Sequence, residues 1–176
     1  MNHLLDRIAE LSHREDLPVL LIGGHAVTSL GCPRSTFDID LLIPRSAQAG
    51  WQKALTTLKY QIFHQSDNFL QFESSPDLPL PPIDFMLVDE EVFEQLSQSQ
   101  VRSTPLSTPS VIQLIALKLH ALRQPSRNEN NKDWGDILGL IDAHSLTLDN
   151  SELNAIVLKH GGEEAITRIS NHLGQP

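Results

Sequence analysis

Apolar residues recur at helical spacing at both ends of the chain, and shorter apolar runs lie between them. The first 15 residues place leucine and isoleucine three and four positions apart, which predicts an amphipathic helix that ends before Pro18. The apolar run Val19–Ile22 predicts a buried strand. The turn Gly23-Gly24 follows it, and a short helix is expected over 25–30. Strand and helix therefore follow one another closely from the start.

The middle of the chain predicts further strands around one more helix. Strand-forming residues dominate several short runs, and turn or proline-rich segments separate them. The expected elements are, in order, a strand over 37–43, a helix over 47–58, a strand pair over 60–64 and 68–72, a strand over 83–88, and a connector over 97–109 with an edge strand near Val101.

The last third of the chain changes to a helical pattern. Apolar residues keep helical spacing over 111–122, and a second helix is indicated over 134–141, beyond a polar loop at 125–131. Two more helices are expected near 153–157 and 166–169. The predicted fold class is α/β (α+β), with a small mixed-sheet core over 1–105 and a helical C-terminal subdomain over 106–176 packed on it.

The amino-acid composition limits the class of protein and the cellular compartment that can be expected. The 176 residues are 40% hydrophobic and 20% charged, which is typical of a globular protein of about one domain. Thirteen basic and 22 acidic residues give a net charge of −9, which argues against a broad nucleic-acid-binding face. The single cysteine, Cys32, excludes a disulfide framework. With no secretory or membrane segment in the pattern, a cytoplasmic location is expected.

Carboxylates in apolar strands are the sharpest chemical feature. Asp38 and Asp40 alternate with isoleucine and leucine, so both project from one strand face and repel each other unless a cation lies between them. Asp84 lies in another apolar run, where an acid is costly unless it is paired or binds a metal. Oxygen-rich sites of this kind suit Mg²⁺, with Mn²⁺ as an alternative. For the first two acids alone, solvated carboxylates on a wet sheet face would be an equally simple explanation.

Residues around these acids favour a phosphate-bearing ligand. Gly23 and Gly24 lie between a strand and a helix, where backbone N–H groups can approach a phosphate closely. Arg34 and Thr36 immediately precede the acid pair and could contact an anion. A plain strand-to-helix turn and a surface cation are the alternatives for these two features.

Taken together, these residues resemble a known superfamily. A Gly-Gly turn, then thirteen residues, then Asp-hydrophobic-Asp, and a third acid on a later strand are similar to the DNA polymerase β-like nucleotidyltransferases. The segment 21–40 is close to the small bacterial branches, which include AbiEii-type toxin nucleotidyltransferases and aminoglycoside and lincosamide nucleotidyltransferases. The resemblance covers about residues 18–88.

A second block resembles the AbiEii-type group in particular. Lys118 and Arg123, then Arg127, then Asp133 and Asp136 follow a helical pattern of basic residues and paired acids. The two acids are three residues apart and share a helix face. The resemblance places Lys118 and Asp136 in the active site. The alternative is a structural set of salt bridges between two helices.

The resemblance implies transfer of a nucleoside monophosphate from a nucleoside triphosphate, such as ATP, to a hydroxyl group, with release of pyrophosphate. It assigns catalysis to Asp38, Asp40, Asp84 and Lys118, and metal binding to the same three acids. It assigns nucleotide binding to Gly23, Gly24, Arg34, Thr36 and Asp136.

The acceptor stays open at this point. RNA such as tRNA or a protein hydroxyl would fit a toxin-like enzyme, with an antitoxin-like partner. A small molecule such as an antibiotic is the alternative, and an acidic chain suits a cationic one. A non-catalytic nucleotide- or partner-binding module is a third hypothesis. No membrane partner is expected.

Overall fold

The computed structural model describes residues 2–102, 105–123 and 132–174. Contacts divide the chain into two compact units, the first consisting of Met1–Ala26 and Arg34–Pro109 and the second of Val27–Pro33 and Ser110–Pro176. The segment Val27–Pro33 thus groups with the C-terminal helices, which no local pattern in the sequence indicates. The predicted domain boundary after residue 105 stays a prediction.

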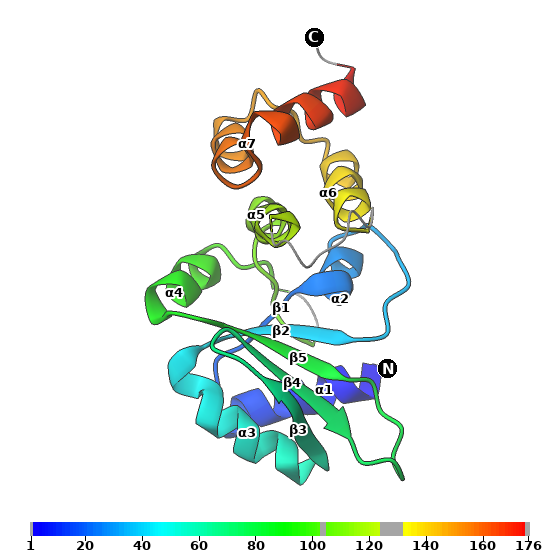
Figure 1. Cartoon of the computed structure of the whole chain (residues 1–176), viewed down its shortest axis with the longest axis vertical. Coiled ribbons are helices and arrows are strands. Elements are labelled where there is room, and N and C mark those ends of the chain that lie inside the picture. Colours follow the sequence, from blue (N-terminus) through cyan, green and yellow to red (C-terminus); the bar gives the residue numbers. More distant parts are fainter. Residues whose placement is uncertain (1, 103–104, 124–131, 175–176) are drawn as a thin grey trace. The chain divides into compact units, whose positions relative to one another are not determined.

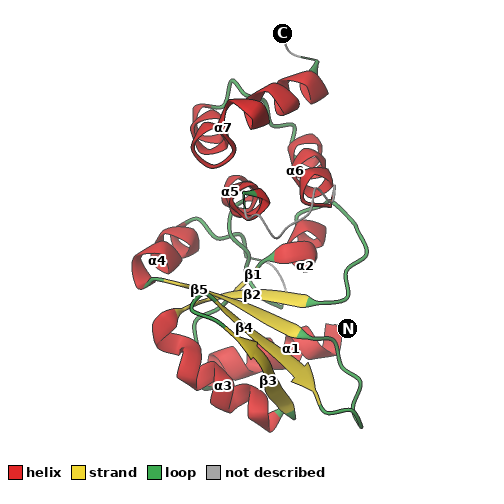
Figure 2. Ribbon diagram, in the orientation of Figure 1, coloured by secondary structure: helices red, strands yellow, loops and turns green. Residues whose placement is uncertain are grey.

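The first unit contains a five-stranded mixed sheet (Figure 2). Strands β2 and β5 pair in parallel, and the other neighbours pair in antiparallel fashion. This confirms the predicted α/β class with a small mixed sheet. In the order in which they lie across the sheet, the strands are β1 (Leu20–Leu21), β2 (Ile39–Pro44), β5 (Ile83–Val88), β4 (Phe69–Ser74) and β3 (Tyr60–Gln65).

Helices α1 (Asn2–Arg14) and α3 (Gln48–Thr57) lie on one face of this sheet (Figure 1). A short 3₁₀ turn, η1 (Arg45–Ala47), leads from β2 into α3. The Trp51 ring on α3 lies 5.4 Å from the Phe85 ring on β5, and Phe72 on β4 meets Phe85 edge-on at 5.8 Å. All three are almost fully buried. Because side chains alternate along a strand, the residues next to these aromatic rings project from the opposite face.

One helix of the first unit was not predicted from the sequence. Helix α4 (Glu90–Gln98) follows β5 directly, with Asp89 at its N-cap position and two glutamates in its first turn. These are ordinary helix-start signals. The expected edge strand near Val101 is a single bridge between Val101 and Thr108. The first strand, β1, is two residues long rather than four.

The second unit is helical, as the pattern predicts. Helix α2 (Gly23–Ser29) begins in the first unit and runs into the second. A capping box between Ser110 and Gln113 starts α5 (Val111–Leu122), and α6 (Lys132–Ala143) follows it. Helix α7 (Ser151–Leu173) spans the last two expected helices and is interrupted at Gly162, whose φ of 72° is not helical.

Two further expectations bear on the chain as a whole. The polar loop at 125–131, and Arg127 within it, lie outside the described residues. Within the described ranges, no helix has both the length and the apolar character needed to cross a membrane.

Candidate functional site: a carboxylate cluster on the sheet

Three aspartates meet on the sheet face opposite the aromatic core. Asp40 on β2 and Asp84 on β5 are direct neighbours in the parallel pairing, and Asp38 immediately precedes β2. Each offers one carboxylate oxygen, and these oxygens all lie within 4.8 Å of one another. All three residues are half-buried. The sheet register therefore brings together acids from two strands that are far apart in the sequence.

The donor set fits a divalent cation. Oxygen ligands are those that Mg²⁺, Mn²⁺ and Ca²⁺ prefer, at metal–oxygen distances of about 2.0–2.6 Å. Oxygens separated by up to twice such a distance can share one ion, which matches the spacing of this cluster. Without a cation, the carboxylates would repel one another on a partly desolvated surface.

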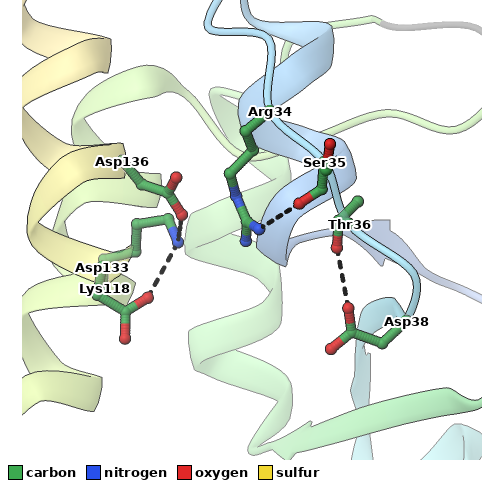
Figure 3. A network of polar contacts seen from close by, with 7 residues as sticks. All are labelled: Arg34, Ser35, Thr36, Asp38, Lys118, Asp133 and Asp136. Carbon is green, nitrogen blue, oxygen red and sulfur yellow. Dashed lines mark hydrogen bonds and ion pairs between the residues drawn. The ribbon is translucent and has the colours of Figure 1, made fainter. Parts of the chain in front are cut away.

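Hydrogen bonds and burial set the state of individual carboxyl groups. The Thr36 hydroxyl donates a hydrogen bond of 2.9 Å to Asp38, which fixes that carboxylate at the entry to β2 (Figure 3). Burial raises the pKa of Asp84, and the charge of Asp38 acts in the same direction. A hydrogen bond from the Gln71 side chain opposes this rise in the pKa of Asp84. The environment of Asp84 therefore favours its protonated form.

The Gly-Gly turn packs directly against these residues. Gly23 has a φ of +63°, and a Cβ there would lie 1.8 Å from Oδ2 of Asp40. A Cβ on Gly24 would lie 2.6 Å from Nη2 of Arg34 and from Oγ1 of Thr36. The turn is tied to β2 by the Ile22 N–H, which donates to the Asp40 carbonyl at 3.0 Å. Only residues without a side chain allow this approach of backbone to carboxylate.

His25, directly after the turn, has an unusual environment. Its Nε2 atom is buried and has no hydrogen-bond partner among the described residues. Burial lowers the pKa of His25, although the nearby negative charge of Asp38 acts against this. Burial therefore favours the neutral imidazole.

Lys118 and Asp136 form a second cluster, within the helical unit. Nζ of Lys118 on α5 lies 2.5 Å from Asp136 and 3.2 Å from Asp133, both on α6 (Figure 3). Lys118 is 6% exposed and Asp136 is 3% exposed, so this is a buried ion pair. The geometry agrees with the structural alternative, in which charges join two helices.

The structure thus gathers the predicted residues in two groups. The first unit holds the three acids with the Gly-Gly turn, Arg34 and Thr36, while the second unit holds Lys118 and Asp136. Arg34 donates from Nη1 to the Ser35 carbonyl at 3.1 Å. Sequence reasoning missed Gln71. The only signal for it was a polar residue between Leu70 and Phe72, which places it on the face opposite the aromatic core.

Comparison with known proteins gives structural matches only. No known protein family and no curated protein sequence matches the chain. The solution structure of the antibiotic-resistance factor ANT(2'')-Ia superimposes with a TM-score of 0.68 at 16% identity, over 98% of this chain and 97% of that one. The chain has a nucleotidyltransferase-like fold.

Two other nucleotidyltransferase structures agree on the fold. An antigenic nucleotidyltransferase-like protein from Paracoccidioides brasiliensis matches with a TM-score of 0.59 at 16% identity, over 98% of this chain and 91% of its own. The lincomycin-bound lincosamide antibiotic adenylyltransferase LnuA matches with a TM-score of 0.57 at 15% identity, over 77% of this chain and 93% of its own. At these identities the likeness concerns the fold.

Proposed function

We propose that this protein is a nucleotidyltransferase that moves a nucleoside monophosphate from a nucleoside triphosphate to a hydroxyl acceptor and releases pyrophosphate. The observation that carries the proposal is the meeting of Asp38, Asp40 and Asp84 on one sheet face of a nucleotidyltransferase-like fold. Three half-buried carboxylates within reach of one cation supply the kind of site that metal-assisted phosphoryl chemistry uses.

In this proposal, the three aspartates hold Mg²⁺, for which Mn²⁺ can substitute. A bound divalent cation would offset charge on the reacting phosphate oxygens. Asp84 also receives the proton of the attacking hydroxyl, a role supported by the upward shift of its pKa. Asp38 and Asp40 act only as ligands of the cation. The hydrogen bond from the Thr36 hydroxyl holds the Asp38 carboxylate in place.

The triphosphate is assigned to the Gly-Gly turn and its neighbours. Gly23 brings backbone close to Asp40, and Gly24 brings it close to Arg34 and Thr36, without side chains that would separate the turn from these groups. Arg34 lies against Gly24 and supplies a guanidinium for phosphate oxygens, while Thr36, on the same side of the turn, contributes by holding Asp38 through its hydroxyl. ATP is the first triphosphate to test, because LnuA is an adenylyltransferase.

Catalytic and nucleotide-binding roles for Lys118 and Asp136 stay predictions. Their burial in an ion pair supports a structural contribution to the helical unit. A variant pair that separates stability from activity tests both roles, as argued below.

For the acceptor, the proposal is a small hydroxylated molecule. The chain and ANT(2'')-Ia, which has been crystallised with adenylyl-2''-tobramycin, cover nearly all of each other's length. By contrast, the chain spans 32% of the Megavirus polyadenylate synthase that it also matches. A net charge of −9 favours a neutral or cationic acceptor over a polyanion.

The test is nucleotide transfer from each α-labelled nucleoside triphosphate with Mg²⁺, offered a panel of aminoglycosides, lincosamides and other polyols, total RNA and protein. The Asp38→Asn/Asp40→Asn double variant is the matched control, with its fold checked by circular dichroism. Label on a small molecule, lost in the double variant, is the expected result. Label on RNA or protein instead would overturn the small-molecule proposal and favour the toxin-like alternative with an antitoxin partner. Absence of both transfer and metal-dependent triphosphate binding would overturn the proposed enzymatic activity.

A further inference from the structure

A row of polar side chains crosses the sheet at the level of the carboxylate cluster, on the face opposite the aromatic core. Asp40 on β2 pairs with Asp84 on β5, Asp84 with Gln71 on β4, and Gln71 with His64 on β3. Cross-strand partners project from the same face of a sheet. Asp84 is therefore flanked by a carboxylate on one side and by the Gln71 amide on the other.

Gln71 and Asp84 are direct cross-strand partners in the β4–β5 register, and a hydrogen-bonding interaction with the Gln71 side chain acts to lower the pKa of Asp84. An ionised carboxylate only accepts hydrogen bonds, so the Gln71 amide nitrogen is the donor. Both residues are half-buried, and competition from water is reduced there. The contact comes from sheet register and does not depend on a loop.

This arrangement determines which way the carboxylate can turn. An aspartate has two oxygens, and a donor on the β4 side engages one of them. The remaining acceptor positions of Asp84 then face the side of Asp38 and Asp40, whose oxygens lie within 4.8 Å. Groups that orient a metal ligand in this way typically change metal affinity or activity about 10–100-fold when they are removed.

We propose that Gln71 is a positioning residue for Asp84, whose amide holds that carboxylate in the orientation that completes the cation site. The proposal rests on the proposed function, because it takes Asp84 as a ligand to the catalytic cation. A neutral amide suits this place, since it donates to Asp84 without adding a fourth charge to three converging acids.

Gln61 on β3 offers a matched control. It is a glutamine of the same sheet that pairs with Glu73 and is exposed. Gln71→Met keeps length and removes the donor, and Gln61→Met makes the same change away from Asp84. Gln71→Thr is a second variant, because a β-branched polar residue suits a half-exposed strand position and its hydroxyl is too short to replace the amide.

The experiment measures binding of Mn²⁺ alone by electron paramagnetic resonance, and then transfer kinetics with Mg²⁺. We expect both Gln71 variants to weaken Mn²⁺ binding about 10–100-fold and to lower kcat, with the triphosphate KM changed by less than about twofold. Gln61→Met should match the wild type. In an Asp84→Asn background, Gln71→Met should cause no further loss of Mn²⁺ binding, because its effect passes through Asp84.

Different results would overturn the positioning role of Gln71 and the proposed function. If the wild-type protein binds Mn²⁺ and transfers nucleotide, and both Gln71 variants do so equally well, the positioning role is overturned. The proposed function is then unaffected. Equal losses from Gln71→Met with and without Asp84 also overturn it, since Gln71 would then act on the sheet generally. Wild-type protein that neither binds Mn²⁺ nor transfers nucleotide overturns the function itself and the positioning role with it.

Discussion

Gly23 and Asp40 approach so closely that a Cβ on Gly23 would lie 1.8 Å from the Oδ2 atom of Asp40. The glycine also has a φ of +63°, which L-residues rarely adopt. Two independent constraints, backbone conformation and space beside a carboxylate, therefore fix glycine at one position of the Gly-Gly turn. Any side chain at this position must displace Asp40 from the cluster.

Gly23→Ala should accordingly remove activity along with some stability. Alanine in the left-handed region costs roughly 1–2 kcal/mol. A ligand shifted by about 1 Å can lower the rate on the order of 100-fold. Gly31→Ala is the control, because Gly31 has a φ of +90° and a Cβ added there would meet no atom within 4 Å. Urea unfolding should show a loss of stability in both variants, larger in Gly23→Ala, and electron paramagnetic resonance and transfer assays should show a loss of Mn²⁺ binding and of activity in Gly23→Ala alone. Equal binding in the two would refute the steric argument.

Asp84→Asn should stabilise the protein at neutral pH while abolishing transfer. Burial and the charge of Asp38 raise the pKa of Asp84 above its usual 3.8. The folded state thus favours the protonated carboxyl, and the stability this confers below pH 3.8 is lost as the pH rises through the shifted pKa. Removing the charge should therefore raise the stability at pH 7, as is common when a group kept for function rather than stability is replaced.

Thermal melts at several pH values measure this effect. The difference between Asp84→Asn and the wild type should be largest near neutral pH and should vanish below pH 3.8. Asp77→Asn, at an exposed position of the loop before β5, serves as the control. Mg²⁺ should raise the melting temperature of the wild type but not of Asp84→Asn. A variant less stable than the wild type at pH 7 would contradict the prediction.

The ionisation of Tyr60 measures how well the β3 edge of the sheet is buried. It is 3% exposed, and its hydroxyl donates to the Pro81 carbonyl at 2.7 Å. Burial raises the pKa of Tyr60 to about 12. Because the folded state holds this proton more tightly, the contribution to stability is complete below about pH 10 and is lost as the pH rises towards 12.

The chain has one tyrosine, so its titration can be followed without interference. The ultraviolet absorbance of tyrosinate should appear near pH 12 in the native protein and near pH 10 in concentrated denaturant. Titration of the native protein near pH 10, with the fold intact by circular dichroism, would show that Tyr60 is exposed to solvent in solution.

Local patterns predicted most of the first unit because its strands are short and strongly apolar. The strand over 83–88 has the expected bounds, and Ile39, Leu41 and Ile43, which alternate with the acids, are fully buried, as is Leu42. Asp38 falls just outside β2, because the pairing of β2 with β5 begins at Ile39. The nearness of Asp84 to Asp40 could not be predicted from spacing, since it depends on which strands pair and in which register.

The parts that sequence reasoning missed are mostly those set by pairing at long range. Gln71 meets Asp84 only through the β4–β5 register, which the local pattern along either strand does not determine. Val27–Pro33 joins the helical unit, where Cys32 packs against Gly139 so closely that a Cβ on that glycine would lie 2.4 Å from Sγ. The unpredicted α4 had local signals in Asp89 and the following glutamates, and these could have revealed it.

The buried pair of Lys118 and Asp136 yields the last prediction. Lys118→Ala takes away the ammonium 2.5 Å from a carboxylate that is 3% exposed, and breaking such a pair typically costs about 3–5 kcal/mol. Lys53→Ala, at an exposed position on α3, should change stability by less than about 0.5 kcal/mol. Urea unfolding measures both variants, and a loss below about 1 kcal/mol in Lys118→Ala would rule out a structural pair.

The Lys118→Met/Asp136→Leu double variant then separates structure from chemistry. Replacing both charges with apolar groups of similar volume is often neutral or stabilising, so the double variant should recover most of the stability lost in Lys118→Ala. If transfer returns together with stability, the pair acts only by joining α5 to α6. If the double variant is stable and inactive, the charges themselves are needed, as the resemblance implies for Lys118 and Asp136. Stability and activity are thus measured on the same protein, and the result decides whether the charges do more than join the two helices.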